Sequence, residues 1–122
     1  MSGFGELEAD IMKRLWRRGD TATVRDIFEE LRPERGLAYT TVMTVMDTLH
    51  RKGWLSRERD GRAWRYQPIA TQEEYTARLM REALDGSTDQ ALAFTHFVEK
   101  MTKEESKILG AALRRHDRRR GR

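Results

Sequence analysis

The stretch LAYTTVMTVMDTLHRKG, from Leu37 to Gly53, has two faces that differ in chemistry as well as in polarity. Its apolar residues recur at helical spacing, which predicts an amphipathic helix with one face on a core. The residues of this predicted apolar face are Val42, Val45, Met46 and Leu49.

The opposite face carries short hydroxyls and methyls in place of the usual Glu and Lys side chains. Threonine can hydrogen-bond a base edge or a phosphate and can pack its methyl group on thymine, so this face suits the major groove of DNA. The alternative is a solvent-exposed helix that happens to be rich in threonine. The outward residues are Thr40, Thr41, Met43, Thr44, Asp47, Thr48 and Arg51.

Charged residues on this helix are expected to divide into two roles. Arg51 and Lys52, at its carboxyl end, predict contacts with DNA phosphates. Asp47 either accepts a hydrogen bond from the amino group of a cytosine or repels the backbone, and the residue pattern leaves both open.

Composition bounds the class of protein. The chain has 122 residues, of which 38% are hydrophobic, so we expect either one small domain or one domain with a short appended module. With no cysteine, disulfides, thiolate catalysis and cysteine-based metal sites are excluded. The sequence shows neither a long apolar run nor a signal peptide, which predicts a soluble, cytoplasmic protein.

Enzymatic motifs are absent from the sequence. His50, His96 and His116 are isolated, and there is no HExxH pair, nucleophile elbow or phosphate-binding glycine loop. We therefore predict a protein that is not an enzyme and that needs no cofactor or metal.

The net charge of +4 is unevenly placed along the chain. Between Thr48 and Pro68 six basic residues stand against two acidic ones, whereas Ile69 to Leu113 holds five basic and eight acidic residues. A basic surface carried by an acidic module is the distribution expected of a phosphate-binding protein.

Two shorter helices are predicted before the central one. The first runs from Glu6 and ends at Gly19, and the strand-like TATV segment is expected to form a short edge pairing. The second runs from Val24 to Leu31, with Thr23 as its cap and Asp26 three residues further on.

After Gly53 the apolar period changes to that of strands. The segment WLSRERDGRAWRYQP predicts a hairpin around Asp60-Gly61, because glycine tolerates the positive φ of a tight turn. Three helices followed by a hairpin is the order of a winged helix-turn-helix domain, in which the third helix enters the major groove. The alternative is a solvated hairpin with scattered arginines. The predicted backbone contacts of this wing are Arg59, Arg62 and Arg65, with Arg57 beside them.

The carboxyl-terminal half predicts three helices with wide apolar faces. Their starts are marked by Thr71 with Glu74, Ser87 with Gln90, and Thr102 with Glu105. Three short helices cannot bury such faces alone, which predicts a dimerisation module, the alternative being packing back onto the winged domain. The predicted dimer contacts are Tyr75, Leu79, Leu92, Phe94, Phe97, Val98, Ile108, Leu109 and Leu113.

The fold expected is thus mainly α with a small β-hairpin. We place a winged helix-turn-helix DNA-binding domain at residues 1–70 and a three-helix dimerisation module at 71–113. Residues 114–122, with six arginines and one aspartate, are expected to form a basic, disordered tail.

Several blocks of this sequence resemble the penicillinase repressors of bacteria, the BlaI/MecI type, from about Gly5 to Leu113. The more specific blocks are Ala38-Tyr39-Thr40-Thr41-Val42-Met43-Thr44, then Leu49 and Lys52-Gly53, then Gly61-Arg62-Ala63 with Tyr66 and Pro68. The less specific ones are Leu7-Glu8, Met12, Leu15-Trp16 and Val24.

The resemblance implies a homodimeric winged-helix repressor that binds palindromic operator DNA and blocks transcription. In that family Thr40, Thr41 and Thr44 match residues that contact DNA, with backbone contacts from the end of the helix and from the wing. It also implies induction through a membrane metalloprotease that senses a β-lactam and leads to cleavage within the dimerisation helices.

Two positions depart from the family pattern. Thr48 stands where many members have an arginine, which puts more of the phosphate binding on Arg51 and Lys52. His96-Phe97 is the candidate cleavage site, aligned with an Asn-Phe bond in the family. The related copper-responsive repressors bind metal through cysteines, so that mode of sensing is excluded.

Two further hypotheses remain open from the sequence. A winged helix also serves as a protein-interaction adaptor without sequence-specific DNA binding, although such a surface more often carries an apolar or aromatic hot spot. His96 lies among Phe94, Phe97 and Val98, where a core or interface histidine is expected, and such a histidine would give a pH-sensitive interface.

Overall fold

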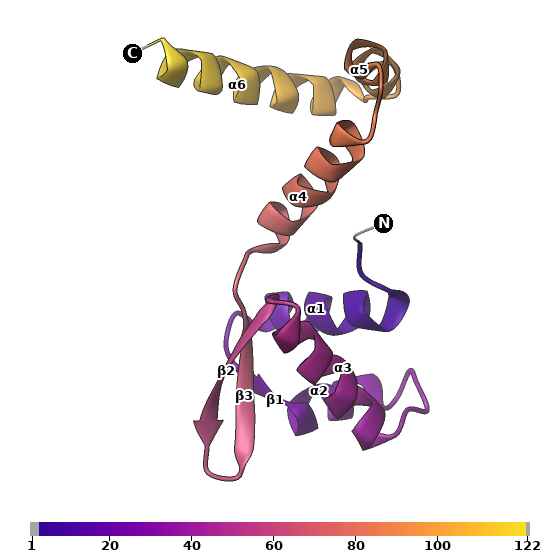
Figure 1. The fold of residues 1–122 in the computed structure, drawn as a ribbon, viewed down its shortest axis with the longest axis vertical. Helices are drawn as coiled ribbons and strands as arrows, with labels where there is room; N and C mark the ends of the chain where they lie inside the picture. Colours follow the sequence, from indigo (N-terminus) through magenta and orange to yellow (C-terminus); the bar gives the residue numbers. More distant parts are fainter. Residues whose placement is uncertain (1–2, 122) are drawn as a thin grey trace. The chain divides into compact units, whose positions relative to one another are not determined.

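The chain divides into two compact units, Met1–Met80 and Arg81–Arg122. The structure, a computed structural model, describes residues 3–121, and Figure 1 gives the order of the elements. The first unit holds α1 (Glu6–Arg18), β1 (Ala22–Thr23), α2 (Val24–Leu31), α3 (Tyr39–Arg51), β2 (Leu55–Asp60) and β3 (Ala63–Pro68). Then α4 (Gln72–Asp85) begins in the first unit and ends in the second, which also holds α5 (Gln90–Glu99) and α6 (Lys103–Arg120).

The end of α1 and the start of α2 lie at residues that local chemistry selects. Gly19 ends α1 with a φ of 67°, in the left-handed region that glycine adopts without strain. Thr23 and Asp26 form a reciprocal cap for α2: the Asp26 N–H donates to Thr23 Oγ1 at 3.1 Å, and the Thr23 N–H donates to Asp26 Oδ2 at 3.0 Å. These predicted boundaries are confirmed.

The predicted hairpin is confirmed and belongs to a three-stranded antiparallel sheet of order β1-β3-β2. The short β1 completes the sheet by pairing with β3. The turn lies one residue later than predicted, because Asp60 still pairs with Ala63, so Gly61 and Arg62 are the central turn residues. Gly61, at φ 62°, is the one of this pair with positive φ, as a two-residue turn with glycine in its first central position requires.

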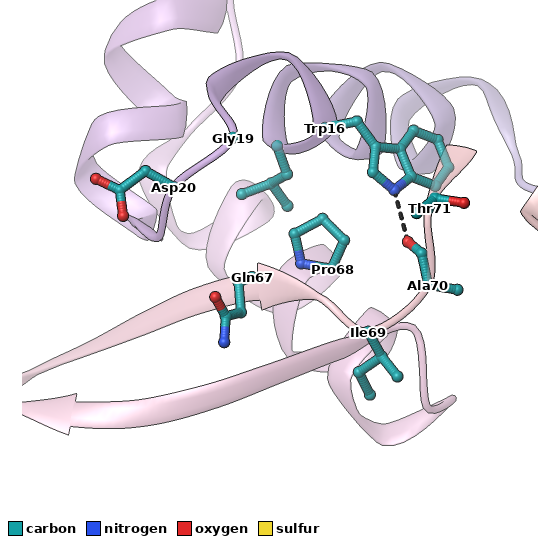
Figure 2. Close-up of a pocket in the computed structure, with 9 residues that line it drawn as sticks. Trp16, Gly19, Asp20, Gln67, Pro68, Ile69, Ala70 and Thr71 are labelled. Carbon is teal, nitrogen blue, oxygen red and sulfur yellow. Dashed lines mark hydrogen bonds between the residues drawn. The ribbon is translucent and has the colours of Figure 1, made fainter. Parts of the chain in front are cut away.

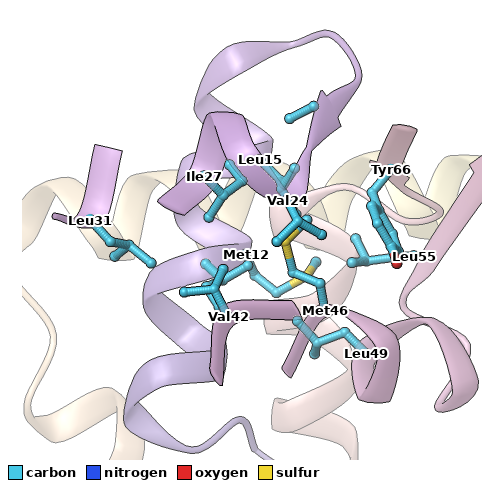
Figure 3. Close-up of a cluster of buried hydrophobic side chains, with 12 residues drawn as sticks. Met12, Leu15, Val24, Ile27, Leu31, Val42, Met46, Leu49, Leu55 and Tyr66 are labelled. Carbon is cyan, nitrogen blue, oxygen red and sulfur yellow. The ribbon is translucent and has the colours of Figure 1, made fainter. Parts of the chain in front are cut away.

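A single core of twelve buried side chains holds the first unit together (Figure 3). Every helix and strand from α1 to β3 contributes to it, so each predicted amphipathic face is used. Fully burying side chains of this size is worth about 1.5–3 kcal/mol each before the entropy of ordering them is subtracted. The core residues are Ile11, Met12, Leu15, Ala22, Val24, Ile27, Leu31, Val42, Met46, Leu49, Leu55 and Tyr66.

Ion pairs hold the loop that leads into α3 against α1. The buried Arg14 of α1 bonds Asp10 at 3.0 Å and Glu34 of the loop at 2.7 Å. Arg35 of the same loop returns to Asp10 at 3.0 Å. Because two guanidiniums share one carboxylate across the loop, the start of α3 is fixed relative to α1.

Aromatic side chains join the beginning of α4 to the first unit. Tyr75 stacks on Phe4 with centroids 4.2 Å apart, and its hydroxyl accepts the Phe4 N–H at 2.8 Å. Trp54 meets both rings edge-on. The compact first unit therefore ends within α4, whereas the sequence placed a boundary after residue 70.

A surface pocket of about 240 Å³ lies beside this joint (Figure 2). In it the indole N–H of Trp16 donates to the Ala70 carbonyl oxygen at 2.9 Å. Pro68 and Ile69, at the end of β3, line the same pocket. The bond fastens the segment between β3 and α4 to α1.

The last three helices differ from the prediction at the start of α5 and at the end of α6. Their first and third caps are confirmed, since Thr71 with Glu74 and Thr102 with Glu105 bond reciprocally. The cap of α5, however, is Asp89, whose carboxylate accepts the Leu92 N–H at 3.0 Å.

The basic tail, residues 114–122, was predicted to be disordered, and residues 114–120 are helical instead, while Arg122 lies outside the described residues. Helix α6 continues to Arg120. Arginine is a good helix former, and cations in the last turn interact favourably with the negative end of the helix dipole. A run of arginines at this end therefore extends the helix.

Candidate nucleic-acid interface

The exposed face of α3 holds the threonines selected from the sequence. Thr40, Thr41, Met43 and Thr44 are exposed, while Val42 on the other side is fully buried. Because Val42, Met46 and Leu49 anchor α3 in the core, the helix cannot rotate to hide its threonines without exposing apolar side chains. The result is a rigid row of hydroxyl and methyl groups on the surface.

Thr48 uses its hydroxyl within the helix. Its Oγ1 donates to the Thr44 carbonyl oxygen at 2.9 Å, one turn earlier. This local bond leaves Thr48 a weaker donor for an outside ligand than the threonines at the start of α3.

Asp47 joins α3 to the wing. Its Oδ1 accepts from Arg57 of β2 at 3.1 Å, and its Oδ2 pairs with Arg51 of α3 at 3.1 Å. The sequence had offered base readout or repulsion of the backbone, and neither anticipated this bridge. Its partner could not be identified from spacing, because Arg57 reaches Asp47 only once the hairpin folds back.

The pleat of the hairpin separates its arginines onto two faces. Arg57 and Arg59 lie on the face of Trp64, with their guanidinium carbons 4.3 and 4.8 Å from the Trp64 ring centroid. Arg65 lies on the opposite face, across from Glu58. Arg62 is exposed in the turn.

Arg65 is engaged at the base of the wing. Its Nε donates to Thr21 Oγ1 at 2.8 Å, and its guanidinium lies 3.6 Å from Asp60. These contacts tie β3 to the segment before β1. Arg65 is consequently more committed within the fold than Arg59 or Arg62.

The charge of Arg57 is secured by its neighbours. The hydrogen bond with the Tyr66 hydroxyl has the largest effect and raises the pKa of Arg57. Burial, the next largest, opposes it, and the Asp47 carboxylate adds to the increase, so the pKa lies above its ordinary value. Arg57 is thus a permanent cation beside the exposed face of α3.

Lys52 bridges the end of α3 to the beginning of α1. Its Nζ lies 3.0 Å from Glu8 Oε2. Burial alone would raise the pKa of Glu8, but the backbone N–H of Gly5 and the Lys52 ammonium favour the carboxylate, and the pKa lies below its ordinary value. The structure therefore gives Lys52 a partner that sequence spacing did not suggest.

His50 faces the fold rather than the solvent. Its Nδ1 donates to the Leu55 carbonyl oxygen at 3.0 Å and links α3 to β2. Among residues 3–121 no group of three or more His, Asp or Glu side chains is placed to hold a metal ion.

Two surface residues near the start of α3 were missed in the sequence. The Arg25 guanidinium carbon of α2 lies 4.9 Å from the ring centroid of the exposed Tyr39. A basic residue in the first turn of the second helix of a winged domain was the available signal, because that turn lies near the start of the third helix.

The helices after the wing expose apolar side chains. Across the described residues of α4, α5 and α6 no side chain is buried. Leu79 and Leu109 are half-buried, and Tyr75 packs in the first unit as described. Six of the predicted dimer contacts are 46–61% exposed, namely Leu92, Phe94, Phe97, Val98, Ile108 and Leu113.

His96 is exposed on α5 in one copy, so the expected core position is wrong and the interface position stays a prediction. Its Nδ1 lies 3.7 Å from Glu99 one turn later. No helix in the described part of the chain combines the length and apolar character needed to cross a membrane.

Comparisons with known proteins agree with this architecture. A family model described as penicillinase repressor matches residues 4–115. The transcriptional regulator BlaI of Mycobacterium tuberculosis is 40% identical over 116 residues, which are 93% of this chain and 84% of that protein.

Two solved structures share the fold. The solution structure of the DNA-binding domain of the repressor BlaI matches with a TM-score of 0.53 and 24% identity, over 59% of this chain and 87% of that one. A MarR family protein from Bacillus stearothermophilus matches with a TM-score of 0.50 and 17% identity, over 98% and 76%. At these identities the likeness concerns the winged-helix fold.

Proposed function

The chain belongs to the penicillinase repressor family of DNA-binding transcriptional repressors, and we propose that it acts as a homodimer on palindromic operators. The observation that carries this proposal is the exposed threonine face of α3 beside an arginine-bearing wing. The members of the penicillinase repressor family are transcriptional regulators, so the protein is not an enzyme.

Base readout is assigned to the first two turns of α3. Thr40, Thr41 and Thr44 present hydroxyls and methyls, and Met43 adds an apolar contact. This combination suits thymine methyl groups and neighbouring base edges in the major groove.

Phosphate contacts are assigned to the cations around α3. Arg51 and Lys52 lie at its carboxyl end, and Arg59 and Arg62 are exposed on the wing. Arg65 belongs to the same set by charge, although its bond to Thr21 makes it the least free of these residues to contact a DNA phosphate. Such contacts supply affinity and register without reading sequence.

A second copy of the chain is proposed to cover the apolar helices. Helix α5, QALAFTHFVE, has Phe94, Phe97 and Val98 on one side and Thr95, His96 and Glu99 on the other, and an apolar helix face of that kind is normally buried. Phe94 and Phe97 nevertheless remain about half exposed in one copy. A two-fold symmetric partner would bury both sets and would place two copies of α3 on two half-sites.

Induction through a membrane metalloprotease sensor pathway belongs to the same proposal, because the family resemblance implies it. The expected target is the His96–Phe97 bond, which lies inside α5. A helical peptide bond must unfold locally before a protease can bind it, so cleavage should be faster in the monomer than in the dimer.

The test is selection of bound sequences from a randomised DNA duplex library at moderate salt, followed by mobility shifts with the selected duplex. The proposal is supported if the selected sequences share a palindromic consensus and the protein sediments as a dimer. Binding with no sequence preference and only a strong salt dependence would overturn it, and would favour the adaptor hypothesis.

A further inference from the structure

A carboxylate on a DNA-facing helix needs a physical reason, because it lies where phosphates approach. Asp47 is such a residue, and its side chain is 40% exposed. Both of its oxygens are directed to guanidinium groups, one on α3 and one on β2. The carboxylate is therefore occupied within the protein before DNA arrives.

The two ion pairs of Asp47 differ in strength. Arg51 lies one turn along the same helix and is 68% exposed, so solvent screens the pair and it contributes little. Arg57 comes from another element and is only 23% exposed. The pair with Arg57 is the one that can hold two parts of the fold together.

Arg57 is braced on its other sides by the sheet. Its guanidinium lies over Trp64, and its Nη1 is 3.5 Å from the hydroxyl of Tyr66, which is itself in the core. Arg57 is thus fixed relative to the hairpin, and Asp47 fixes it relative to α3. The chain from Tyr66 through Arg57 to Asp47 connects the wing to the recognition helix.

Asp47 also balances charge on this surface. Arg51, Arg57 and Arg59 all lie on the same side of the first unit, near α3 and Trp64. Without a carboxylate between them, their mutual repulsion would favour a wing displaced from the helix.

We propose that Asp47 is a positioning residue that fixes Arg57, and through it the wing, against α3, so that helix and wing meet the DNA duplex as one rigid surface. The inference rests on the proposed function, since it concerns how the same interface discriminates between sequences. It replaces direct reading of cytosine as the role of Asp47.

Asp47→Asn tests the proposal because asparagine keeps the shape and loses the charge. The affinity for random duplex should rise by about twofold to fivefold, since a repulsive charge is removed from a phosphate-facing surface. The ratio of the affinity for the selected duplex to the affinity for random duplex should fall about tenfold, because a mobile wing no longer favours one position of the protein on the DNA.

A double-mutant cycle with Arg57→Gln separates positioning from base reading. In the Arg57→Gln background, Asp47→Asn should change the ratio of selected to random affinity by less than about twofold, because the partner it positions is already gone. Asp47→Glu should recover part of the ratio in the wild-type background, since its carboxylate can still accept from Arg57.

Asp60→Asn is the matched control for charge alone. Asp60 is an exposed carboxylate at the tip of the same wing and pairs with Arg65 instead. It should raise affinity for selected and random duplex alike and leave their ratio unchanged. If this ratio fell as much in Asp60→Asn as in Asp47→Asn, the positioning role of Asp47 would be overturned.

Amide hydrogen exchange without DNA gives a second, independent result. The amides of β2 and β3 should exchange faster in Asp47→Asn than in the wild type, and unchanged exchange would contradict the bridge. If Asp47→Asn lost preference at one base pair, and lost it equally in the wild-type and Arg57→Gln backgrounds, Asp47 would read that base directly. That result would overturn this inference and leave the proposed function standing. A wild-type protein with no sequence preference would instead overturn the proposed function, and the inference with it.

Discussion

The two compact units of this chain bury their apolar side chains to opposite extents. The first unit closes a core of twelve side chains over six elements, with no buried side-chain nitrogen or oxygen left without a partner among the described residues. The second unit buries no side chain among its described residues 81–121, where Leu92, Phe94 and Phe97 are about half exposed. The first unit completes its core within a single copy, and we propose that the second presents half of a dimer interface.

This difference separates the tasks of recognition and assembly. A closed core lets the first unit hold α3 and the wing in a fixed geometry, which reading a base sequence requires. If the proposed dimer forms, the second unit draws stability from association, and its stability depends on protein concentration. Each prediction below tests one side of this contrast.

Phe97→Asp should have the largest effect on operator affinity, because it places a charge in the proposed dimer interface. Without a dimer only one half-site is held at a time, and operator affinity should fall by about 100-fold or more. Sedimentation and mobility shifts on the selected duplex measure the two effects together.

Thr95→Asp is the control for Phe97→Asp, since it adds the same charge to the same helix at a polar, exposed position. It should leave the chain dimeric. If the Phe97 variant also stays dimeric, the apolar face of α5 is not the interface.

Leu49→Ala should destabilise the first unit by about 2–5 kcal/mol, because Leu49 is fully buried and its removal leaves a cavity. Leu113→Ala removes the same atoms from an exposed position. It should cost less than about 0.5 kcal/mol in dilute protein and more as the protein concentration rises.

Urea unfolding at two protein concentrations measures both leucine variants. A cost for Leu113→Ala that does not depend on concentration would mean that the second unit is stabilised within one chain. The contrast between the two units would then be lost.

Thr44→Ala should cost about 1–3 kcal/mol of operator affinity and relax the preference at one base position. Its control is Thr48→Ala. In the wild type the Thr48 hydroxyl bonds the Thr44 carbonyl oxygen, so its loss should change recognition much less. Selection profiles of both variants make the comparison. Equal profiles for Thr44→Ala and the wild type would remove Thr44 from direct readout.

Arg62→Ala should have the smallest effect of the four. It should weaken all duplexes about equally and reduce the slope of log affinity against log salt by about one unit, since one phosphate contact is lost. Titrations on selected and random duplex measure this, with Arg62→Lys expected to retain most of the slope. A selective loss on one sequence would mean that the wing tip reads bases.

Periodicity was enough to predict most of the architecture. The alternation of Val42, Met46 and Leu49 with the threonines fixed both faces of α3, because helix geometry relates them directly. Caps such as Thr23 with Asp26 were equally readable, since both partners lie within one turn. The disordered tail was the main error, because a cluster of like charges was weighed above helix propensity.

Partners distant in the chain could not be predicted in this way. Lys52 pairs with Glu8, and Arg65 bonds Thr21, across gaps that no local pattern spans. Tyr75 looked like part of the dimer face by spacing, yet its ring stacks on Phe4 at the other end of the first unit. Such pairings depend on how the elements pack and not on their periods.

The central stretch from Leu37 to Gly53 shows where the division lies. Its sequence alone determined a helix with one apolar face and one face of threonines, because local geometry places those side chains. Only the tertiary structure decided what Asp47 does, since its partner Arg57 comes within 3.1 Å through the fold of the hairpin. Local physics assigns a residue to a face, and packing across elements assigns it a partner.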